Sequence, residues 1–159
     1  MRRKNILRGL LCAAVLLGAA LVGAQEVSAR ETVLIAGNAD LYPIESYDSR
    51  SDSYVGLLPE LYRRVSECTD YDLVYLPYSK NTTQAQQAEN RQADIISAFP
   101  AGTVDSAYLR CSELFCSLPA SGKPQNICIG FASALPEAQS EEIARALDGI
   151  GAAERLGIL

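Results

Sequence analysis

The stretch that decides the fold runs from residue 33 to residue 97 and begins with the apolar run Val-Leu-Ile-Ala-Gly at 33–37. A short, uninterrupted apolar run is typical of a central strand that is buried on both faces of a sheet. The aromatic and β-branched segment Tyr-Asp-Leu-Val-Tyr-Leu-Pro-Tyr at 71–78 predicts a second strand, which Pro77 ends. Ala-Asp-Ile-Ile-Ser-Ala at 93–98 predicts a third strand.

Helical patterns separate these strands. Apolar residues recur at 58, 61, 65 and 68, which marks the buried face of an amphipathic helix. Pro59 and Glu60 suit its first turn, where a missing N–H is tolerated and a carboxylate complements the helix dipole. The polar segment 82–91 predicts a second, weakly packed helix. The alternation of strands and helices predicts βαβ units and an α/β fold with a mostly parallel sheet.

The rest of the chain completes this picture. We expect a polar turn at 49–53, a loop with at most one helical turn at 99–124, a strand at 127–131 and a final helix at 136–147. The predicted fold is therefore a single sheet of about four or five strands flanked by helices.

The first residues form a pattern of their own. Arg2, Arg3, Lys4 and Arg8 precede an apolar run at 9–24. This is typical of a secretory signal peptide occupying residues 1–29, with cleavage after Ala24 or Ala29. The alternative is an uncleaved membrane anchor, although about 20 apolar residues are needed to span a bilayer. We expect a secreted, periplasmic or cell-surface protein, which is membrane-anchored if the leader is retained, with residues 30–159 as its domain.

Charge and composition narrow the function. Ten basic and nineteen acidic residues follow Ala24, so the net charge beyond it is 10 − 19 = −9. A strongly acidic domain argues against nucleic acid and anionic lipid as partners. The chain contains no histidine, which excludes the Ser-His-Asp and Cys-His catalytic arrangements and the usual zinc and iron ligand sets. We expect no metal and no cofactor.

Four cysteines lie beyond the leader: Cys68, Cys111, Cys116 and Cys128. An even number in an exported chain suggests disulfides, and four cysteines allow three pairings. Cys111 and Cys116 can be bridged if the segment between them turns back. A buried free thiol at Cys128 is the alternative, and four thiolates around zinc would lack the usual Cys-x-x-Cys spacing. We expect at least one disulfide.

Several short motifs follow one another in a recognisable order. They are Tyr-Pro-Ile at 42–44, Gly-x-x-x-Glu-Leu at 56–61, Gln-Ala-Asp-Ile-Ile at 92–96 and Ser-Glu-Leu-Phe at 112–115. Their order and spacing resemble those of the family 3 periplasmic solute-binding proteins, which deliver amino acids and related solutes to ABC transporters. The resemblance implies a Rossmann-like lobe of the type II periplasmic binding protein fold. The segments after residue 128 are similar to the strand and final helix with which the family returns to its first lobe.

Two departures from the family pattern bear on the site. Between residues 115 and 127, where the family inserts its second lobe, we expect a short loop at 116–126 instead. The family motif Thr-x-x-Arg supplies an arginine that grips a solute carboxylate with two parallel hydrogen bonds. Here Thr103 is followed by Val-Asp-Ser, and the next arginine is Arg110. The resemblance therefore supports the fold of the lobe more strongly than its amino-acid site.

Open α/β sheets bind ligands at the carboxyl ends of their strands. The ligand-binding residues that we predict there are Asn38, Asp40, Tyr42, Ser97, Ala98 and Thr103. Tyr42 matches an aromatic residue that packs on the solute in the family, or else it covers the edge of the sheet. Asp40 is suited to holding a cationic group, and an Asx turn is the alternative. Ser97, Ala98 and Thr103 lie at the carboxyl end of the third strand, and solvated loop residues are the alternative there.

Three functions are compatible with these residues. The first is a non-catalytic, exported solute-binding module, which works with a membrane permease or with a partner chain that closes the cleft. The second is a degenerate lobe that acts in sensing or protein interaction without a solute. An enzyme ranks third because the sequence offers no convincing acid–base pair, although its spacing does not prevent two carboxylates, such as Asp40 and Glu45, from meeting in the fold.

Overall fold

The computed structural model describes residues 29–118 and 124–155. The predicted signal peptide lies outside the described residues except for Ala29, and both of its possible roles remain predictions. Among the residues that are described, no helix is long and apolar enough to cross a membrane.

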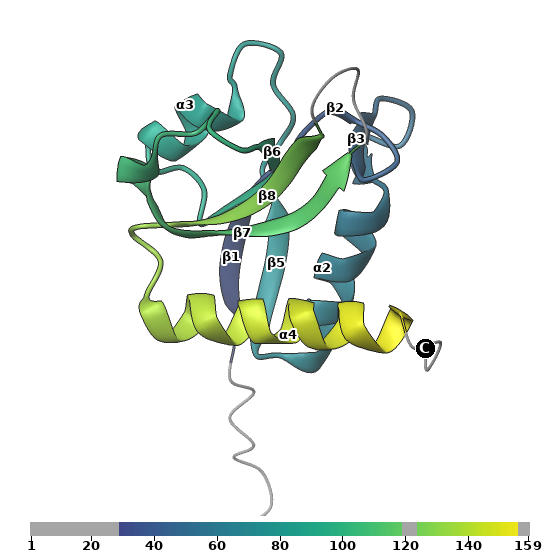
Figure 1. Ribbon diagram of the computed structural model, residues 1–159, viewed down its shortest axis with the longest axis vertical. Helices are drawn as coiled ribbons and strands as arrows, with labels where there is room; N and C mark the ends of the chain where they lie inside the picture. The colour runs from purple at the N-terminus through teal and green to yellow at the C-terminus, as the bar shows by residue number, and fades with distance from the viewer. Residues whose placement is uncertain (1–28, 119–123, 156–159) are drawn as a thin grey trace, which may run out of the picture.

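A five-stranded sheet forms the centre of the domain (Figure 1). Its strands lie in the order β5 (Tyr71–Tyr75), β1 (Glu31–Ala36), β6 (Ile95–Pro100), β8 (Gln125–Ala132) and β7 (Leu109–Leu118). β1 is parallel to β5 and β6, whereas β8 is antiparallel to both β6 and β7. Four strands therefore run in one direction and β8 runs against them. This confirms the predicted α/β class and the mostly parallel sheet.

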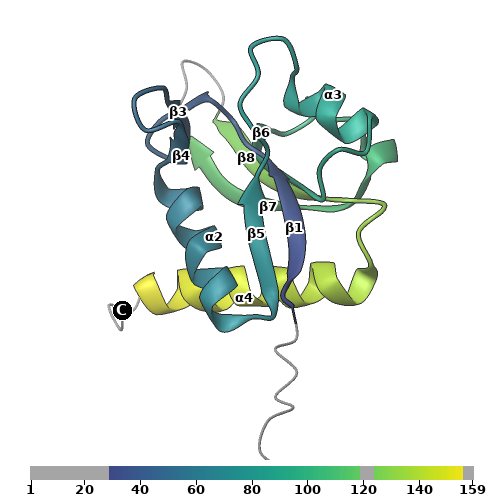
Figure 2. The same cartoon turned by 180° about the vertical axis from the view of Figure 1, so that it is seen from behind.

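Helices cover both faces of this sheet. α2 (Leu57–Cys68) and α4 (Glu137–Arg155) pack against each other and against one face. The short α3 (Gln84–Glu89) packs on the other face and begins at a capping box between Thr83 and Gln86. Figures 1 and 2 show α4 crossing one end of the sheet while α3 lies toward the opposite end.

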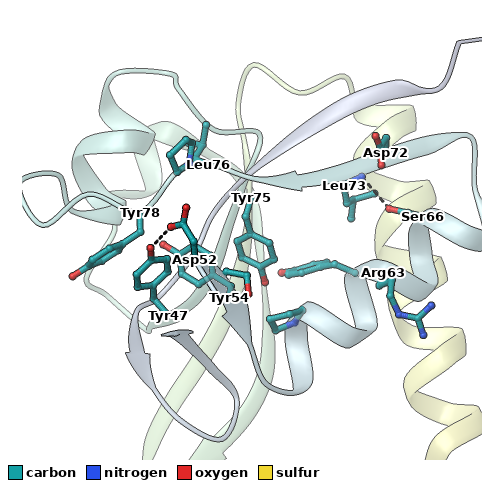
Figure 3. Close-up of a pocket in the computed structure, with 14 residues that line it drawn as sticks. Tyr47, Asp52, Tyr54, Arg63, Ser66, Asp72, Leu73, Tyr75, Leu76 and Tyr78 are labelled. Atoms are coloured by element: carbon teal, nitrogen blue, oxygen red, sulfur yellow. Dashed lines mark hydrogen bonds between the residues drawn. The ribbon is translucent and has the colours of Figure 1, made fainter. Parts of the chain in front are cut away.

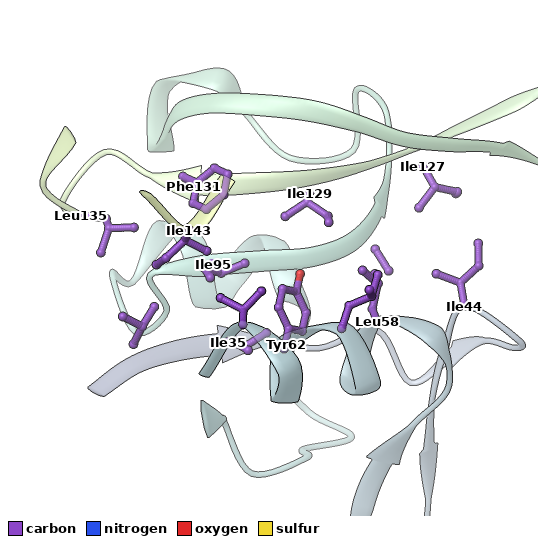
Figure 4. Close-up of a cluster of buried hydrophobic side chains, with 14 residues drawn as sticks. Ile35, Ile44, Leu58, Tyr62, Ile95, Ile127, Ile129, Phe131, Leu135 and Ile143 are labelled. Carbon is purple, nitrogen blue, oxygen red and sulfur yellow. The ribbon is translucent and has the colours of Figure 1, made fainter. Parts of the chain in front are cut away.

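The larger core lies between the sheet and the pair α2 and α4 (Figure 4). α2 buries Leu58, Leu61 and Val65 of its predicted face together with Tyr62, which was not predicted there. Cys68, which was predicted on the same face, is exposed. Ile95 of β6 joins this core, and its neighbour Ile96 joins the smaller core under α3. β6 is thus buried on both faces, as its apolar sequence predicts.

A small antiparallel sheet follows β1 and was not predicted. It consists of β2 (Asp40–Leu41), β3 (Glu45–Asp48) and β4 (Ser53–Val55), in that order. The polar turn expected at 49–53 connects β3 to β4. This hairpin leads directly into α2 and places the first residue of β3, Glu45, against the central sheet.

The prediction of a loop at 99–124 is wrong for much of this segment. The segment contains the 3-10 turn η1 (Ser106–Tyr108) and all of β7, which forms a hairpin with β8. The sequence pattern does not reveal β7, because its pairing with β8 shifts register twice. Each bulge interrupts the alternation of buried and exposed side chains that marks a strand. The connection between the paired strands comprises residues 119–124, not 116–126, and 119–123 of it lie outside the described residues.

The condition for a bridge between Cys111 and Cys116, a segment that turns back between them, is not met. Both residues belong to the continuous strand β7, five positions apart, which corresponds to roughly 16 Å, whereas bridged Cα atoms lie within about 7 Å. Cys68, Cys116 and Cys128 are free thiols. Cys116 packs with the core under α2 and α4, and Cys128 packs with the core on the opposite face. The structure therefore gives no support to a disulfide among these three.

Candidate functional site

A buried carboxylate, Glu45, lies beneath the carboxyl ends of the parallel strands. Its side chain is fully buried, and Ser97 Oγ donates to Oε1 at 2.7 Å. The Tyr75 hydroxyl also donates to Oε1, and the backbone N–H of Asn38 donates to Oε2 at 2.5 Å. Burial raises the pKa of Glu45 to about 7, although these three hydrogen bonds favour the ionised form.

The bonds around Glu45 extend to two helices. The hydroxyl of Tyr62, on α2, donates to Ser97 Oγ at 3.1 Å. The amide of Gln84, on α3, donates to the carbonyl of Ala36 at 3.0 Å and to the carbonyl of Ser97. Three donors, from β5, β6 and the segment after β1, thus hold the carboxylate, and α2 and α3 hold Ser97 in turn. Sequence analysis named Glu45 only as a possible partner of Asp40, which is exposed.

Two of the predicted residues, Asn38 after β1 and Ala98 within β6, do come together. The side-chain amide of Asn38 donates to the carbonyl of Ala98 at 2.8 Å. The carbonyl oxygen of the same amide accepts from the backbone N–H of Asp40 at 3.0 Å, so the Asx turn here is made by Asn38 and not by Asp40. Asp40 itself is exposed at this edge.

The other predicted residues differ in exposure. The ring of Tyr42 is 80% exposed, so it stands in solvent rather than covering the sheet. Ser97 and Ala98 are fully buried, and the hydroxyl of Ser97 donates a hydrogen bond to Glu45. Thr103 is exposed, and its hydroxyl donates to the carbonyl of Pro100 at 2.7 Å. Ser97 thus supports this edge from within, whereas Tyr42 and Thr103 face solvent.

Arg110 does not replace the arginine of the family motif. It is the second residue of β7, which runs in the same direction as β1 and β6, so it lies at the amino end of these strands. Its guanidinium donates to the carbonyls of Leu135 at 3.1 Å and Ser133 at 3.2 Å. Glu137 lies 4.0 Å away. Arg110 therefore stabilises the segment that leads into α4. It lies at the opposite end of the strands from Asn38 and Thr103.

A second feature is a pocket of about 530 Å³ between α2, the β3–β4 hairpin and the outer edge of β5 (Figure 3). We call it the tyrosine pocket. Tyr47, Tyr54, Tyr62, Tyr75 and Tyr78 line it together with Asp52, Ser53, Pro59, Arg63, Ser66, Asp72, Leu73, Leu76 and Pro77. Its tyrosines form two stacked pairs: Tyr47 with Tyr78, whose ring centroids are 4.2 Å apart, and Tyr54 with Tyr75, at 4.5 Å.

Most of these tyrosine hydroxyls are bound within the protein. Tyr75 donates to Glu45, Tyr62 to Ser97 and Tyr47 to Asp52. Burial, followed by the charge of Glu45, raises the pKa of Tyr54 to about 12, so this phenol is neutral at ordinary pH. The pocket therefore presents rings more than hydroxyl groups. Sequence analysis missed it, although seven of the eight tyrosines lie between residues 42 and 78.

Arg63, the one arginine among the described residues that line the pocket, is held by its own helix. Glu60 Oε1 lies 2.6 Å from the guanidinium of Arg63, and Glu67 also pairs with it. Hydrogen bonds from Arg63 and Arg64 lower the pKa of Glu60 to about 2. Within residues 29–118 and 124–155, no three His, Cys, Asp or Glu side chains are placed to hold a metal ion.

Comparison with known proteins agrees with this architecture. No family model matches the chain. No curated protein matches it either. The arginine-bound form of domain 1 from the binding protein TmArgBP is a solved structure that superposes with a TM-score of 0.59 at 16% identity, covering 80% of this chain and 99% of that one. A single-residue variant of the same arginine-bound domain gives the same TM-score and identity, covering 81% and 98%. The chain therefore shares the fold of a solute-binding protein domain.

Proposed function

We propose that this chain is an exported, non-catalytic solute-binding module that binds a small polar solute, such as an amino acid, at the carboxyl ends of β1 and β6. One observation carries the proposal. The chain covers 98–99% of a single domain that holds arginine in its own structure. A lone lobe of this fold is thus large enough to hold a small solute without an opposing lobe. This supports a first lobe of the type II fold, related to the family 3 proteins.

The predicted binding residues support the proposal by their positions. Asn38 joins the two strand ends, and the exposed side chains of Asp40, Tyr42 and Thr103 follow those same ends. This is the edge at which open α/β sheets bind ligands. Ala98 contributes its carbonyl, and Ser97 acts from below through Glu45.

The charges at this edge favour a particular kind of solute. The family position for a carboxylate-binding arginine is occupied by Ser106, and Arg110 is committed to Ser133 and Leu135. Asp40, by contrast, offers a free carboxylate. A solute held mainly through an ammonium or guanidinium group therefore suits the edge better than one held through its carboxylate.

The remaining features fit export and assembly. The leader at 1–29 would carry the domain across a membrane, and the connection at 119–124 would stand where relatives insert a second lobe. A half-open site leaves its solute exposed on one side. A permease or a partner chain that covers this edge would complete it.

A thermal-shift screen tests the proposal. The chain from Ala29 onward contains every described element, and amino acids, polyamines and small peptides would be added at millimolar concentration. A solute that binds the native state must raise the melting temperature. We expect stabilisation by at least one cationic solute, reduced in Asp40→Asn and Tyr42→Ala. A complete absence of stabilisation would refute solute binding.

A second function is favoured by apolar exposure near the same edge. Tyr42 is 80%, Leu57 45% and Val55 38% exposed. Such residues suit a lobe that docks on another protein instead of closing on a solute. Native mass spectrometry at high protein concentration distinguishes the two functions. A strict monomer that retains a solute would support the solute-binding module over the docking lobe.

A further inference from the structure

A buried carboxylate holds the proposed strand-edge site from beneath. Glu45 Oε2 accepts from the backbone N–H of Asn38 at 2.5 Å, and Glu45 Oε1 accepts from Ser97 Oγ at 2.7 Å. The side chain of Asn38 in turn donates to the carbonyl of Ala98 at 2.8 Å and accepts from the backbone N–H of Asp40 at 3.0 Å. Glu45 therefore binds the residue that connects β6 with the exposed part of the site.

Glu45 is also joined through the backbone to the other exposed residues of the site. It pairs with Leu41 in the ladder between β2 and β3. Asp40 and Tyr42 flank Leu41 and are exposed, whereas Glu45 is fully buried. The contacts of the buried carboxylate thus help to set where Asp40 and Tyr42 stand relative to Asn38.

The charge of Glu45 can change near neutral pH while that of its neighbours stays constant. Among the described residues, the titratable side chains that face it are the phenols of Tyr54 on β4, Tyr62 on α2 and Tyr75 on β5. Burial, followed by the charge of Glu45, raises the pKa of each phenol, so all three are neutral at pH 8 and below. Burial raises the pKa of Glu45 itself to about 7.

On the basis of the proposed function, we infer that Glu45 is a positioning residue for the strand-edge site, which binds a cationic solute more tightly when Glu45 is ionised than when it is protonated. Two effects act in this direction. The ionised carboxylate is the stronger acceptor for the N–H of Asn38. Its negative charge also attracts a solute cation at the edge, and its burial weakens the screening by water. The affinity for the solute therefore rises with pH as Glu45 loses its proton.

Isothermal titration calorimetry on the chain from Ala29 onward tests the inference, with agmatine and arginine as probes. Agmatine carries one amine and one guanidine group and no carboxylate, so its charge does not change between pH 5.5 and pH 8. We expect its affinity to rise by roughly fivefold or more across this range, which is the lower end of typical coupling between two sites.

Matched variants assign the rise to Glu45. Glu45→Gln imitates the protonated acid, so at every pH it should bind agmatine as weakly as the unmodified chain does at pH 5.5. Glu141→Gln removes the same charge from an exposed position of α4 and should keep the rise, with affinities within about twofold of the unmodified chain. Asp40→Asn should lower the affinity at every pH and also keep the rise.

A measurement on the unmodified chain does not depend on how the variants fold. The amide resonance of Asn38 should follow the protonation of Glu45, because the two groups are hydrogen-bonded. Saturating agmatine should lower the midpoint of this titration by about 0.7 pH or more, which corresponds to the same fivefold factor. A purely structural Glu45 would leave the midpoint equal with and without agmatine.

The outcomes separate this inference from the proposed function. Binding whose affinity stays constant between pH 5.5 and pH 8, or an unchanged midpoint at Asn38, overturns the role of Glu45 and leaves solute binding intact. A rise that persists in Glu45→Gln, or disappears in Asp40→Asn, also overturns it. Binding of neither probe at any pH, with thermal unfolding showing a folded chain, would instead refute the proposed function and the coupling with it.

Discussion

The hydroxyl of Ser97 donates to the carboxylate of Glu45 at 2.7 Å, and both side chains are fully buried. This bond links the carboxyl end of β6 to the first residue of β3, 52 positions away in the chain. Asn38 and Tyr75 bind the same carboxylate. Glu45 therefore lies between the strand edge and the tyrosine pocket and supports both.

The stability of the fold should depend on pH through Glu45. Its pKa is raised from 4.5 to about 7 in the folded state, so between these values the folded chain binds more protons than the unfolded chain. The free energy of unfolding should thus fall as pH rises from about 4.5 to 7, by about 3 kcal/mol in total. Urea unfolding at a series of pH values measures this.

The variant Glu45→Gln provides the comparison. A glutamine can accept from Asn38 through its oxygen and donate to the Ser97 and Tyr75 hydroxyls, which imitates the protonated acid. It should abolish the decline between pH 4.5 and 7. Glu60→Gln should leave that decline unchanged, because the pKa of Glu60 is lowered to about 2 and its contribution disappears at lower pH. An identical slope in Glu45→Gln and the unmodified chain would contradict the account.

Removal of the Ser97 hydroxyl should destabilise the fold at pH 8. Ser97→Ala leaves the ionised Glu45 with one donor fewer and removes the acceptor of Tyr62. We expect a loss of about 1–3 kcal/mol, measured by urea unfolding. Ser112→Ala, at an exposed position of β7, should change the stability by less than about 0.5 kcal/mol. Equal effects of the two variants would mean that the buried network contributes nothing.

Gly56 should be essential for the entry into α2. Its φ is 129°, and a Cβ there would lie 2.7 Å from the carbonyl oxygen of Ile44. Gly56→Ala should therefore cost about 1–3 kcal/mol of stability. Gly149→Ala, in α4 with nothing near its Cβ position, should instead stabilise by about 0.5–1 kcal/mol. Thermal unfolding that shows no loss in Gly56→Ala would contradict the described turn.

Thiol reactivity checks the cysteine assignment. Cys68 is exposed, whereas Cys116 and Cys128 are partly buried and burial raises the pKa of each thiol. An alkylating reagent without reductant should modify Cys68 rapidly and the other two slowly in the folded chain. All three should react after denaturation, as peptide mass spectrometry would show. A failure of Cys68 to react without reductant would indicate a bridge.

The sequence predicts elements whose pattern is local. β1 is apolar from Val33 to Ala36 and β6 is apolar except for Ser97, because these segments are largely buried on both faces. α2 buries Leu58, Leu61 and Val65 at helical spacing. β7 was missed because its bulges and edge position hide the alternation. Local pattern also gave no sign that β3 buries the carboxylate of Glu45, because its donors come from distant positions such as Ser97 and Tyr75.

The two candidate sites also differ in how far the sequence predicts them. The strand edge follows from a topological rule, so Asn38 and Ala98 could be expected to meet. The tyrosine pocket depends on stacking between residues that are remote in sequence, such as Tyr47 with Tyr78 and Tyr54 with Tyr75. Their spacing has no helical or strand period, and only the hairpin and the edge of β5 bring them together.

Backbone amide NMR of the chain from Ala29 onward, titrated with arginine and related cationic solutes, tests the central claim most directly. The account predicts that saturating solute shifts the amides of residues 38–42, 98, 99 and 101–103 and leaves those of Arg110 and α4 unchanged. Saturation without any shift at the carboxyl ends of β1 and β6, or no binding by any solute at millimolar concentration, would contradict it.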